Sequence, residues 1–248
     1  MTGSLLAGAA TGLGALPLLL VRRISAPLQN AFLAFAAGVM LAAAFFSLLL
    51  PGLKAAADLG LVQVPAAALV GAAVLLGAAT LHLLNAVAPH EHFVAGRHGA
   101  QAPAVSRIWL FVIAITLHNV PEGLAVGVSY SASLENGASM ALGIGLQNVP
   151  EGLAVAAALA AFYPRGTSIL VALLTGLVEP VAAAAGLTAV SAAAPLLPWG
   201  LGFAAGAMIW VVSSEIIPET HGDERSGLST AALMLGFVAM MFLDVTLG

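Results

Sequence analysis

The chain has 248 residues, of which 61% are hydrophobic and only 7% are charged, and its formal net charge is -4. This composition cannot cover a globular surface with water-compatible side chains, so it predicts an integral membrane protein. The small net charge and the lack of a basic run exclude a nucleic-acid-binding role. The absence of cysteine excludes disulfides and thiolate metal sites.

Eight apolar segments follow one another along the chain, each long enough to cross a bilayer as a helix. They are rich in Ala, Leu, Val and Gly at every angular position and lack the polar alternation of transmembrane strands. This pattern predicts a single all-α domain over residues 1–248. The expected helices lie near residues 4–21, 29–53, 62–87, 107–131, 137–162, 167–192, 198–217 and 229–247.

The distribution of basic residues predicts the orientation of these helices. If both termini lie outside, Lys54 is the only basic residue of the connections on the outer side, as the positive-inside rule requires. The first segment has no basic residue before it and is followed by Arg22 and Arg23, so we expect a retained helix and not a secretion signal. The other basic residues then fall in cytoplasmic connections: Arg97, Arg107, Arg165 and Arg225.

One polar octapeptide, Asn-Val-Pro-Glu-Gly-Leu-Ala-Val, occurs twice, at residues 119–126 and 148–155, within the fourth and fifth segments. His118 precedes the first copy and Gln147 precedes the second. Polar and acidic side chains at this depth are costly, so they indicate a functional site. The two helices run in opposite directions and carry the motif at similar depth, so we expect the copies to meet near the membrane midplane as two halves of one site.

The spacing within each copy directs its side chains. Residues four apart share a helical face, so His118 points with Glu122, and Gln147 with Glu151. Two glutamates brought together in this way need a cation or a proton between them. Hydrogen bonding that merely joins the helices is the alternative, but it is usually provided by Ser, Thr or one Asn.

Backbone features support the same interpretation. Pro121 and Pro150 are expected to bend their helices and to free the carbonyls of Leu117 and Leu146. Gly123 and Gly127 form a pair of small residues that predicts close helix packing.

Further candidate ligands lie outside the two motifs. Glu179, before Pro180, makes the sixth helix the best candidate for a third contributor. Met40 offers a thioether, although its spacing alone indicates packing. His82 is expected to hydrogen-bond a neighbour. Weaker candidates, which could receive a released metal, lie near the cytoplasmic ends of the helices: Glu215, Glu219 and His221 at the end of the seventh segment, and His90 and His92 in the third connection. For the two histidines of the third connection, a solvated polar loop is an equal interpretation.

The paired motifs His118-Asn119-x-Pro121-Glu122-Gly123 and Gln147-Asn148-x-Pro150-Glu151-Gly152 resemble those of prokaryotic members of the ZIP family of divalent metal transporters. The resemblance spans essentially the whole chain. It implies a binuclear site bridged by Glu122 and Glu151. One metal would be held by Met40, His118, Glu122, Gln147 and Glu151, and its neighbour by Asn119, Glu122, Asn148, Glu151 and Glu179.

The resemblance also implies metal uptake across the bacterial inner membrane. The first, fourth, fifth and sixth helices would move as an elevator against a scaffold of the other four, and the scaffold would form a homodimer. Gln147 stands where many members have histidine, and the neutral Asn148 stands where some relatives have an acidic residue. The second ion should therefore be held more weakly.

Ligand type favours Zn²⁺ as the substrate, with Cd²⁺, Fe²⁺ or Mn²⁺ also plausible, and no organic cofactor is expected. A proton or alkali-cation translocator using the same carboxylates is an open alternative. An intramembrane metalloenzyme is less favoured, because the chain contains neither His-Glu-x-x-His nor Gly-x-Ser-x-Gly.

Overall fold

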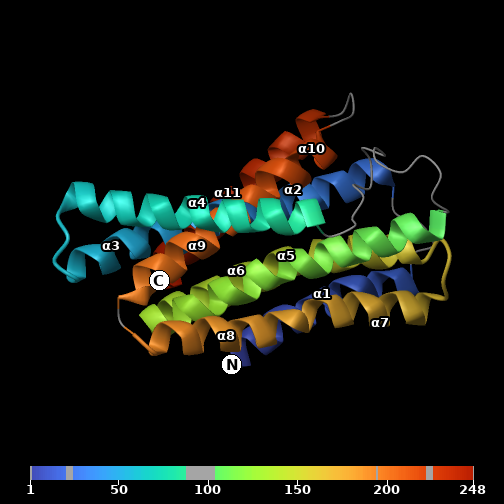
Figure 1. Ribbon diagram of the computed structural model, residues 1–248. Helices are drawn as coiled ribbons and strands as arrows, with labels where there is room; N and C mark the ends of the chain where they lie inside the picture. Colours follow the sequence, from blue (N-terminus) through green and yellow to red (C-terminus); the bar gives the residue numbers. More distant parts are fainter. Residues whose placement is uncertain (1, 21–24, 88–103, 194, 222–225, 248) are drawn as a thin grey trace.

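The computed structural model describes residues 2–20, 25–87, 104–193, 195–221 and 226–247, and every regular element in these ranges is helical (Figure 1). Seven of the predicted segments form helical stretches long and apolar enough to cross a membrane. The eighth, α5 (Ala104–Ala132), is 29 residues long. The prediction of an all-α, multi-span membrane protein is therefore confirmed, with seven candidate spans and α5 as the eighth long helix.

Besides α5, three of these long stretches are single uninterrupted helices, and the other four are interrupted. The single helices are α4 (Gln63–Val87), α6 (Leu134–Leu159) and α11 (Ser226–Leu247). The interrupted spans are α1 (Thr2–Ala15) with η1 (Leu16–Leu19), α2 (Ala26–Ala42) with η2 (Ala43–Leu49) and α3 (Leu50–Asp58), α7 (Arg165–Gly176) with α8 (Val178–Ser191), and α9 (Leu196–Val211) with η3 (Val212–Ile216) and α10 (Ile217–Thr220).

The interruptions follow the prolines only in part. α5 and α6 continue as helices through Pro121 and Pro150, whereas the sixth span breaks at Leu177, before Pro180. The segments η2 and η3 are π-helical, and each is followed within two residues by a proline, Pro51 or Pro218. Because proline lacks an amide hydrogen and clashes with the carbonyl four residues back, a wider turn before it accommodates the ring.

The helices pack in two groups that meet along one seam (Figure 1). In the first group α1 lies against α6, α7 and α8, and α5 lies against α6 and α8. In the second group α2 pairs with α11, and α4 pairs with α9. Contacts of α6 with α2 and α11, and of α5 with α9, join the groups.

Glycine residues bring helix backbones together within the first group. A Cβ atom at Gly152 of α6 would overlap the backbone of Thr11 in α1, and one at Gly127 of α5 would overlap the backbone of Ala183 in α8. A Cβ at Gly123 would likewise overlap the backbone of Glu179. Close helix packing, predicted for Gly123 and Gly127, is therefore what these residues provide.

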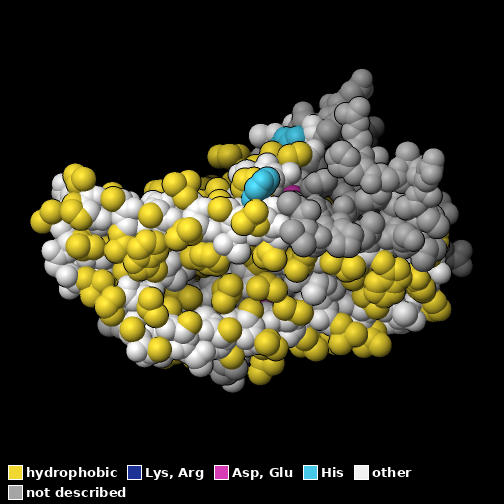
Figure 2. Space-filling model, viewed as in Figure 1, with side chains coloured by type: hydrophobic (Ala, Val, Ile, Leu, Met, Phe, Trp, Pro, Cys, Tyr) yellow, Lys and Arg dark blue, Asp and Glu magenta, His cyan; other side chains and the backbone are white. Residues whose placement is uncertain are grey.

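The outer surface matches a hydrocarbon environment. Hydrophobic side chains are spread over the described face of the molecule from end to end (Figure 2). Only 11% of the span in α11 and 28% of that in α4 is buried within the protein. These helices therefore present most of their apolar side chains outward, as lipid-facing helices do.

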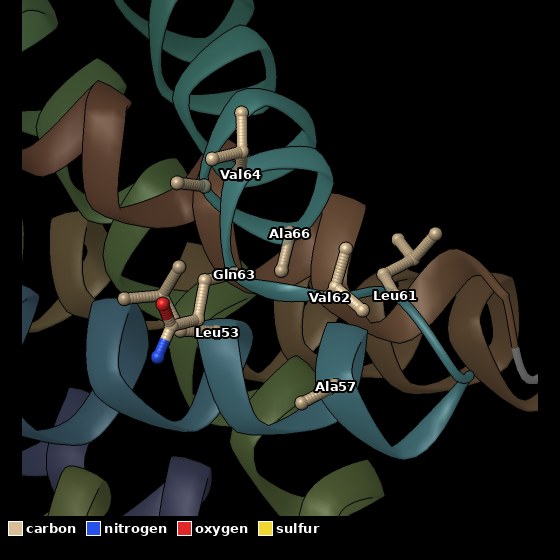
Figure 3. A pocket seen from close by; sticks show the side chains of 8 residues that line it. Leu53, Ala57, Leu61, Val62, Gln63, Val64 and Ala66 are labelled. Carbon is tan, nitrogen blue, oxygen red and sulfur yellow. The ribbon is translucent and has the colours of Figure 1, made fainter.

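An apolar pocket of about 740 Å³ lies where α3 is connected to α4, between Leu53 and Ala57 on one side and Val62, Val64 and Ala66 on the other (Figure 3). Among the described residues that line it, Gln63 is the only one with a polar side chain, and none carries a carboxylate or an imidazole.

Candidate metal site

The α5–α6 hairpin brings the two copies of the motif into contact. Ser133 alone separates the helices, and its hydroxyl caps α6 by accepting a hydrogen bond from the Asn136 backbone amide at 2.9 Å. The helices consequently run in opposite directions. Across the pair, Gln147 Nε2 donates a hydrogen bond to Glu122 Oε1 at 2.5 Å. Both side chains are fully buried.

A second contact ties the motif of α6 to the broken sixth span. Asn148 Nδ2 donates to Glu179 Oε1 at 2.6 Å and also to the backbone carbonyl of Ala7 in α1 at 2.7 Å. Glu179 is the second residue of α8, directly after the break. A carboxylate is favoured at a helix N-terminus, where backbone amides and the helix dipole stabilise its charge. Asn148 of α6 thus joins α8 and α1, and a metal-binding role for Glu179 stays a prediction.

His118 faces a residue of the second helix group. Its Nε2 lies 2.7 Å from Glu215 Oε2, and Glu215 belongs to the π-helical segment η3. Both residues are buried. Single-turn π segments are frequent at functional sites, because the extra residue redirects a side chain. The structure therefore places Glu215, one of the weaker candidates, beside the principal histidine.

Several oxygen and nitrogen atoms in this region are buried without a hydrogen-bond partner among the described residues. They include one carboxylate oxygen from each of Glu122, Glu151 and Glu179. The side-chain amide oxygens of Gln147 and Asn148 are also buried without a partner. Buried polar atoms without partners are costly, and a cation would satisfy the oxygens. The atoms are Glu122 Oε2, Glu151 Oε2, Glu179 Oε2, Gln147 Oε1, Asn148 Oδ1, both side-chain polar atoms of Asn119, and His118 Nδ1.

No Lys or Arg among the described residues pairs with Glu122, Glu151 or Glu179. The described basic side chain of Arg165 instead lies near the Leu19 carbonyl, with Nη1 at 3.5 Å. The described residues also contain no group of three or more His, Asp or Glu side chains already arranged as metal ligands. The site is thus acidic and buried, and its side chains are engaged in pairs.

The remaining principal candidates are buried in the same helices. Asn119 follows His118 in α5, and Glu151 lies one turn beyond Gln147 in α6. Met40 is 1% exposed and lies in α2, which packs against α6. Coordination of a metal by these residues stays a prediction.

The weaker candidates are dispersed. Both ring nitrogens of His221 have protein partners: Nδ1 lies 3.1 Å from the Ile217 carbonyl, and Nε2 lies 3.2 Å from Thr230 Oγ1. These contacts join α10 to α11. Glu219 belongs to α10, but its side chain lies outside the described part of the structure, as do His90 and His92. The ring of His82 packs edge-on against Trp210, with centroids 5.0 Å apart.

Sequence reasoning missed the contribution of α1. The Ala7 carbonyl holds the Asn148 amide, and the buried Thr11 hydroxyl, one turn further, has no partner among the described residues. Thr11 lies against both Gly152 and Gly176, which flank the site on α6 and α7. The sequence feature that could have indicated this contribution of α1 is the spacing of Gly8 and Gly12 within an apolar helix, because it predicts a close approach to a neighbouring backbone.

Comparison with known proteins identifies relatives over the whole chain. The family model for the ZIP zinc transporters matches residues 89–244. The chain is 47% identical over 252 residues to the zinc transporter GufA of Myxococcus xanthus, covering 100% of this chain and 98% of GufA. It is 49% identical over 245 residues to the zinc transporter ZIPB of Bordetella bronchiseptica, covering 97% of this chain and 78% of ZIPB.

Another relative matches over a shorter region. The human zinc transporter ZIP11 is 47% identical over 150 residues, which cover 57% of this chain and 44% of ZIP11. Members of this family are membrane transporters and not enzymes. The match over residues 89–244, together with the near full-length relatives, shows that this chain belongs to the ZIP zinc transporter family.

Proposed function

We propose that the protein carries a divalent transition metal, most of all Zn²⁺, into the cytoplasm across a bacterial plasma membrane. One observation carries this proposal. Two copies of an acidic motif on antiparallel helices meet at the Gln147–Glu122 hydrogen bond, and buried carboxylate oxygens beside it have no partner. The names of GufA and ZIPB as zinc transporters support the choice of metal.

The proposed site is binuclear, with Glu122 and Glu151 bridging two ions. Met40, His118 and Gln147 would complete the first coordination sphere, and Asn119, Asn148 and Glu179 the second. The contacts of Gln147 with Glu122, and of Asn148 with Glu179, support this grouping because ligands of one ion must lie close together. One imidazole, several carboxylate oxygens and a thioether suit Zn²⁺ and do not exclude Cd²⁺, Fe²⁺ or Mn²⁺.

Transport is proposed to occur by alternating access. The group formed by α1, α5, α6, α7 and α8 would move against the scaffold of α2, α3, α4, α9, α10 and α11, which would form a homodimer with both chain termini outside. The packing of helices in two groups supports this division. Met40 and Glu215 would then lie on the static side, so their contacts with the moving group would break in each cycle.

Ion flux into liposomes tests the proposal directly. Purified protein should carry Zn²⁺ into vesicles, and equal gradients of Na⁺ or K⁺ should produce no flux. A parallel recording with an internal pH dye separates the main alternative. Proton flux that does not depend on zinc, in the absence of metal transport, would favour a proton translocator and contradict the proposal.

Acid is expected to weaken uptake. Metal must displace protons from His118, Glu122 and Glu151, so a lower pH favours the protonated ligands. The half-saturating zinc concentration should therefore rise as the external pH falls, and the maximal rate should change less. Initial rates measured over a range of zinc concentrations at several pH values provide the check. A half-saturating concentration independent of pH would argue against ligation by these groups.

Glu215 is expected to act as a positioning residue for His118. With Nε2 hydrogen-bonded to Glu215, the unpartnered Nδ1 is the atom left to bind metal. Carboxylates that orient a metal-binding histidine typically contribute about 10–100-fold to metal affinity. Glu215→Ala should raise the half-saturating zinc concentration by about that factor. Glu215→Gln, which keeps a hydrogen-bond acceptor, should restore part of the affinity, and equal defects in the two variants would contradict this role.

A further inference from the structure

A second cavity, of about 400 Å³, lies on the seam between the two helix groups, where α6 meets α2 and α11. Its walls are Phe32 and Phe35 of α2, Leu146, Val149 and Leu153 of α6, and Leu235 of α11, together with smaller residues. None of the described residues that line it has a polar side chain. We call this cavity the seam groove. Its volume falls within the range of about 300–1,000 Å³ that is usual for ligand pockets.

The seam groove lies at the same depth as the metal site, on the other side of α6. Residues 146, 149, 150 and 153 form one helical face that lines the groove. On the same turns, Gln147 and Asn148 bond to residues of α5 and α8. The groove is therefore deep within the hydrocarbon layer and separated from the polar site by one helix.

The chemistry of the groove selects a hydrocarbon occupant. A stable water molecule needs two to four polar partners, and the described lining side chains provide none. The groove is also continuous with the lipid-facing surface, because Phe32 is 38% exposed, Val149 43% and Leu235 66%. We propose that the seam groove binds one acyl chain of a membrane phospholipid, inserted between α6 and the α2–α11 pair.

An acyl chain at this position would contact both helix groups at once. If α6 moves relative to α2 as proposed above, the chain would have to leave or slide in each cycle, and the lipid tail would then influence the transport rate. Binding itself does not depend on that movement. The site can therefore be tested without any measurement of transport.

Photocrosslinking in vesicles tests the site. The protein is reconstituted in phosphatidylethanolamine and phosphatidylglycerol with a trace of phosphatidylcholine that carries a diazirine in one acyl tail. Peptides covering residues 146–153 should be labelled well above peptides from the outer face of α4. Ala31→Leu and Ala232→Leu extend lining side chains into the groove. Either change should lower this labelling about tenfold, because the larger side chain displaces part of the acyl chain. The loss of contacts for roughly two methylene groups of the lipid weakens binding by about that factor.

The matched control is Ala72→Leu, which makes the same change at an exposed position of α4 and should leave the labelling of residues 146–153 unchanged. Labelling at the level of the α4 surface, or labelling unaffected by either groove variant, would overturn the proposal.

A second copy of the chain is the alternative occupant. Because the chain contains no cysteine, Val149→Cys or Leu235→Cys gives a single thiol. Efficient disulfide formation between two copies through either position would show that the groove is a protein interface and would also overturn the proposal. Zinc uptake measured on the same preparations shows separately whether the proposed transport function holds.

Discussion

Zinc uptake is expected to be lost when Glu122 and Glu151 are both changed to glutamine. The double substitution keeps the size of each side chain but removes the two charges that the proposed site places between the metal ions. Loss of residues that merely orient metal ligands costs about 10–100-fold, so loss of two bridging ligands should reduce the initial rate of uptake by at least about 100-fold.

The fold should survive this change. Both carboxylates are buried, and the described residues give neither a Lys nor an Arg partner, so neutral side chains relieve a desolvation cost. Thermal unfolding of the double variant should therefore occur at the same temperature as in the unchanged protein, or higher. Uptake of radioactive zinc by liposomes and unfolding followed by tryptophan fluorescence together separate loss of transport from loss of structure.

Glu135→Gln is the matched control for the charge. Glu135 lies in the first turn of α6 and is exposed, so its substitution removes one negative charge from the same helix without touching the site. Uptake should be close to normal. If the double variant carried zinc at the rate of this control, the proposed site would be wrong.

A single methyl group at Gly152 is expected to destabilise the protein severely. The Cβ of Gly152→Ala would overlap the backbone oxygen of Thr11 and lie 2.6 Å from its carbonyl carbon. Backbone atoms cannot rotate aside as a flexible side chain can, so α1 and α6 must separate. Overpacking of this kind typically costs about 1–3 kcal/mol and sometimes more. We expect a lower unfolding temperature and a reduced yield from membranes.

Gly145→Ala tests whether this effect is local. Gly145 lies in the same helix, and the nearest atom to its added Cβ would be Ala7 Cα at 3.7 Å, an ordinary van der Waals contact. Alanine is favoured over glycine in a helix by about 1 kcal/mol, so this variant should be as stable as the unchanged protein or slightly more stable. Equal unfolding temperatures for the two alanine variants would contradict the close approach of α1 to α6.

The fold class was predictable because hydrocarbon imposes strong constraints on a sequence. Long apolar segments must be helical, and their number gives the number of spans. The meeting of Glu122 with Gln147 was predictable from two copies of one motif on adjacent antiparallel helices. Glu179 was predictable because an acidic residue in a membrane span is rarely without a partner.

Other features depend on tertiary packing and have weak local signals. The π-helical turn that carries Glu215 depends on how the proline at 218 is accommodated against its neighbours, so residue spacing did not predict the contact with His118. The use of the Ala7 carbonyl was equally hidden, because any residue has a carbonyl group. The backbones of α1 and α6 approach closely at Thr11 and Gly152, and the Ala7 carbonyl lies within hydrogen-bond distance of Asn148 one turn away.

The two amide hydrogen bonds have a consequence for the return half of a transport cycle. A carrier that has delivered its cargo must bring its acidic groups back through a medium of low dielectric constant. In this protein Gln147 donates to Glu122 and Asn148 donates to Glu179, so each of these carboxylates has a neutral donor nearby that can take over part of the role of a cation. If the protein transports metal as proposed, the carboxamides would lower the barrier to resetting the empty carrier. A second histidine in place of Gln147 would then bind metal more tightly but serve this step less well.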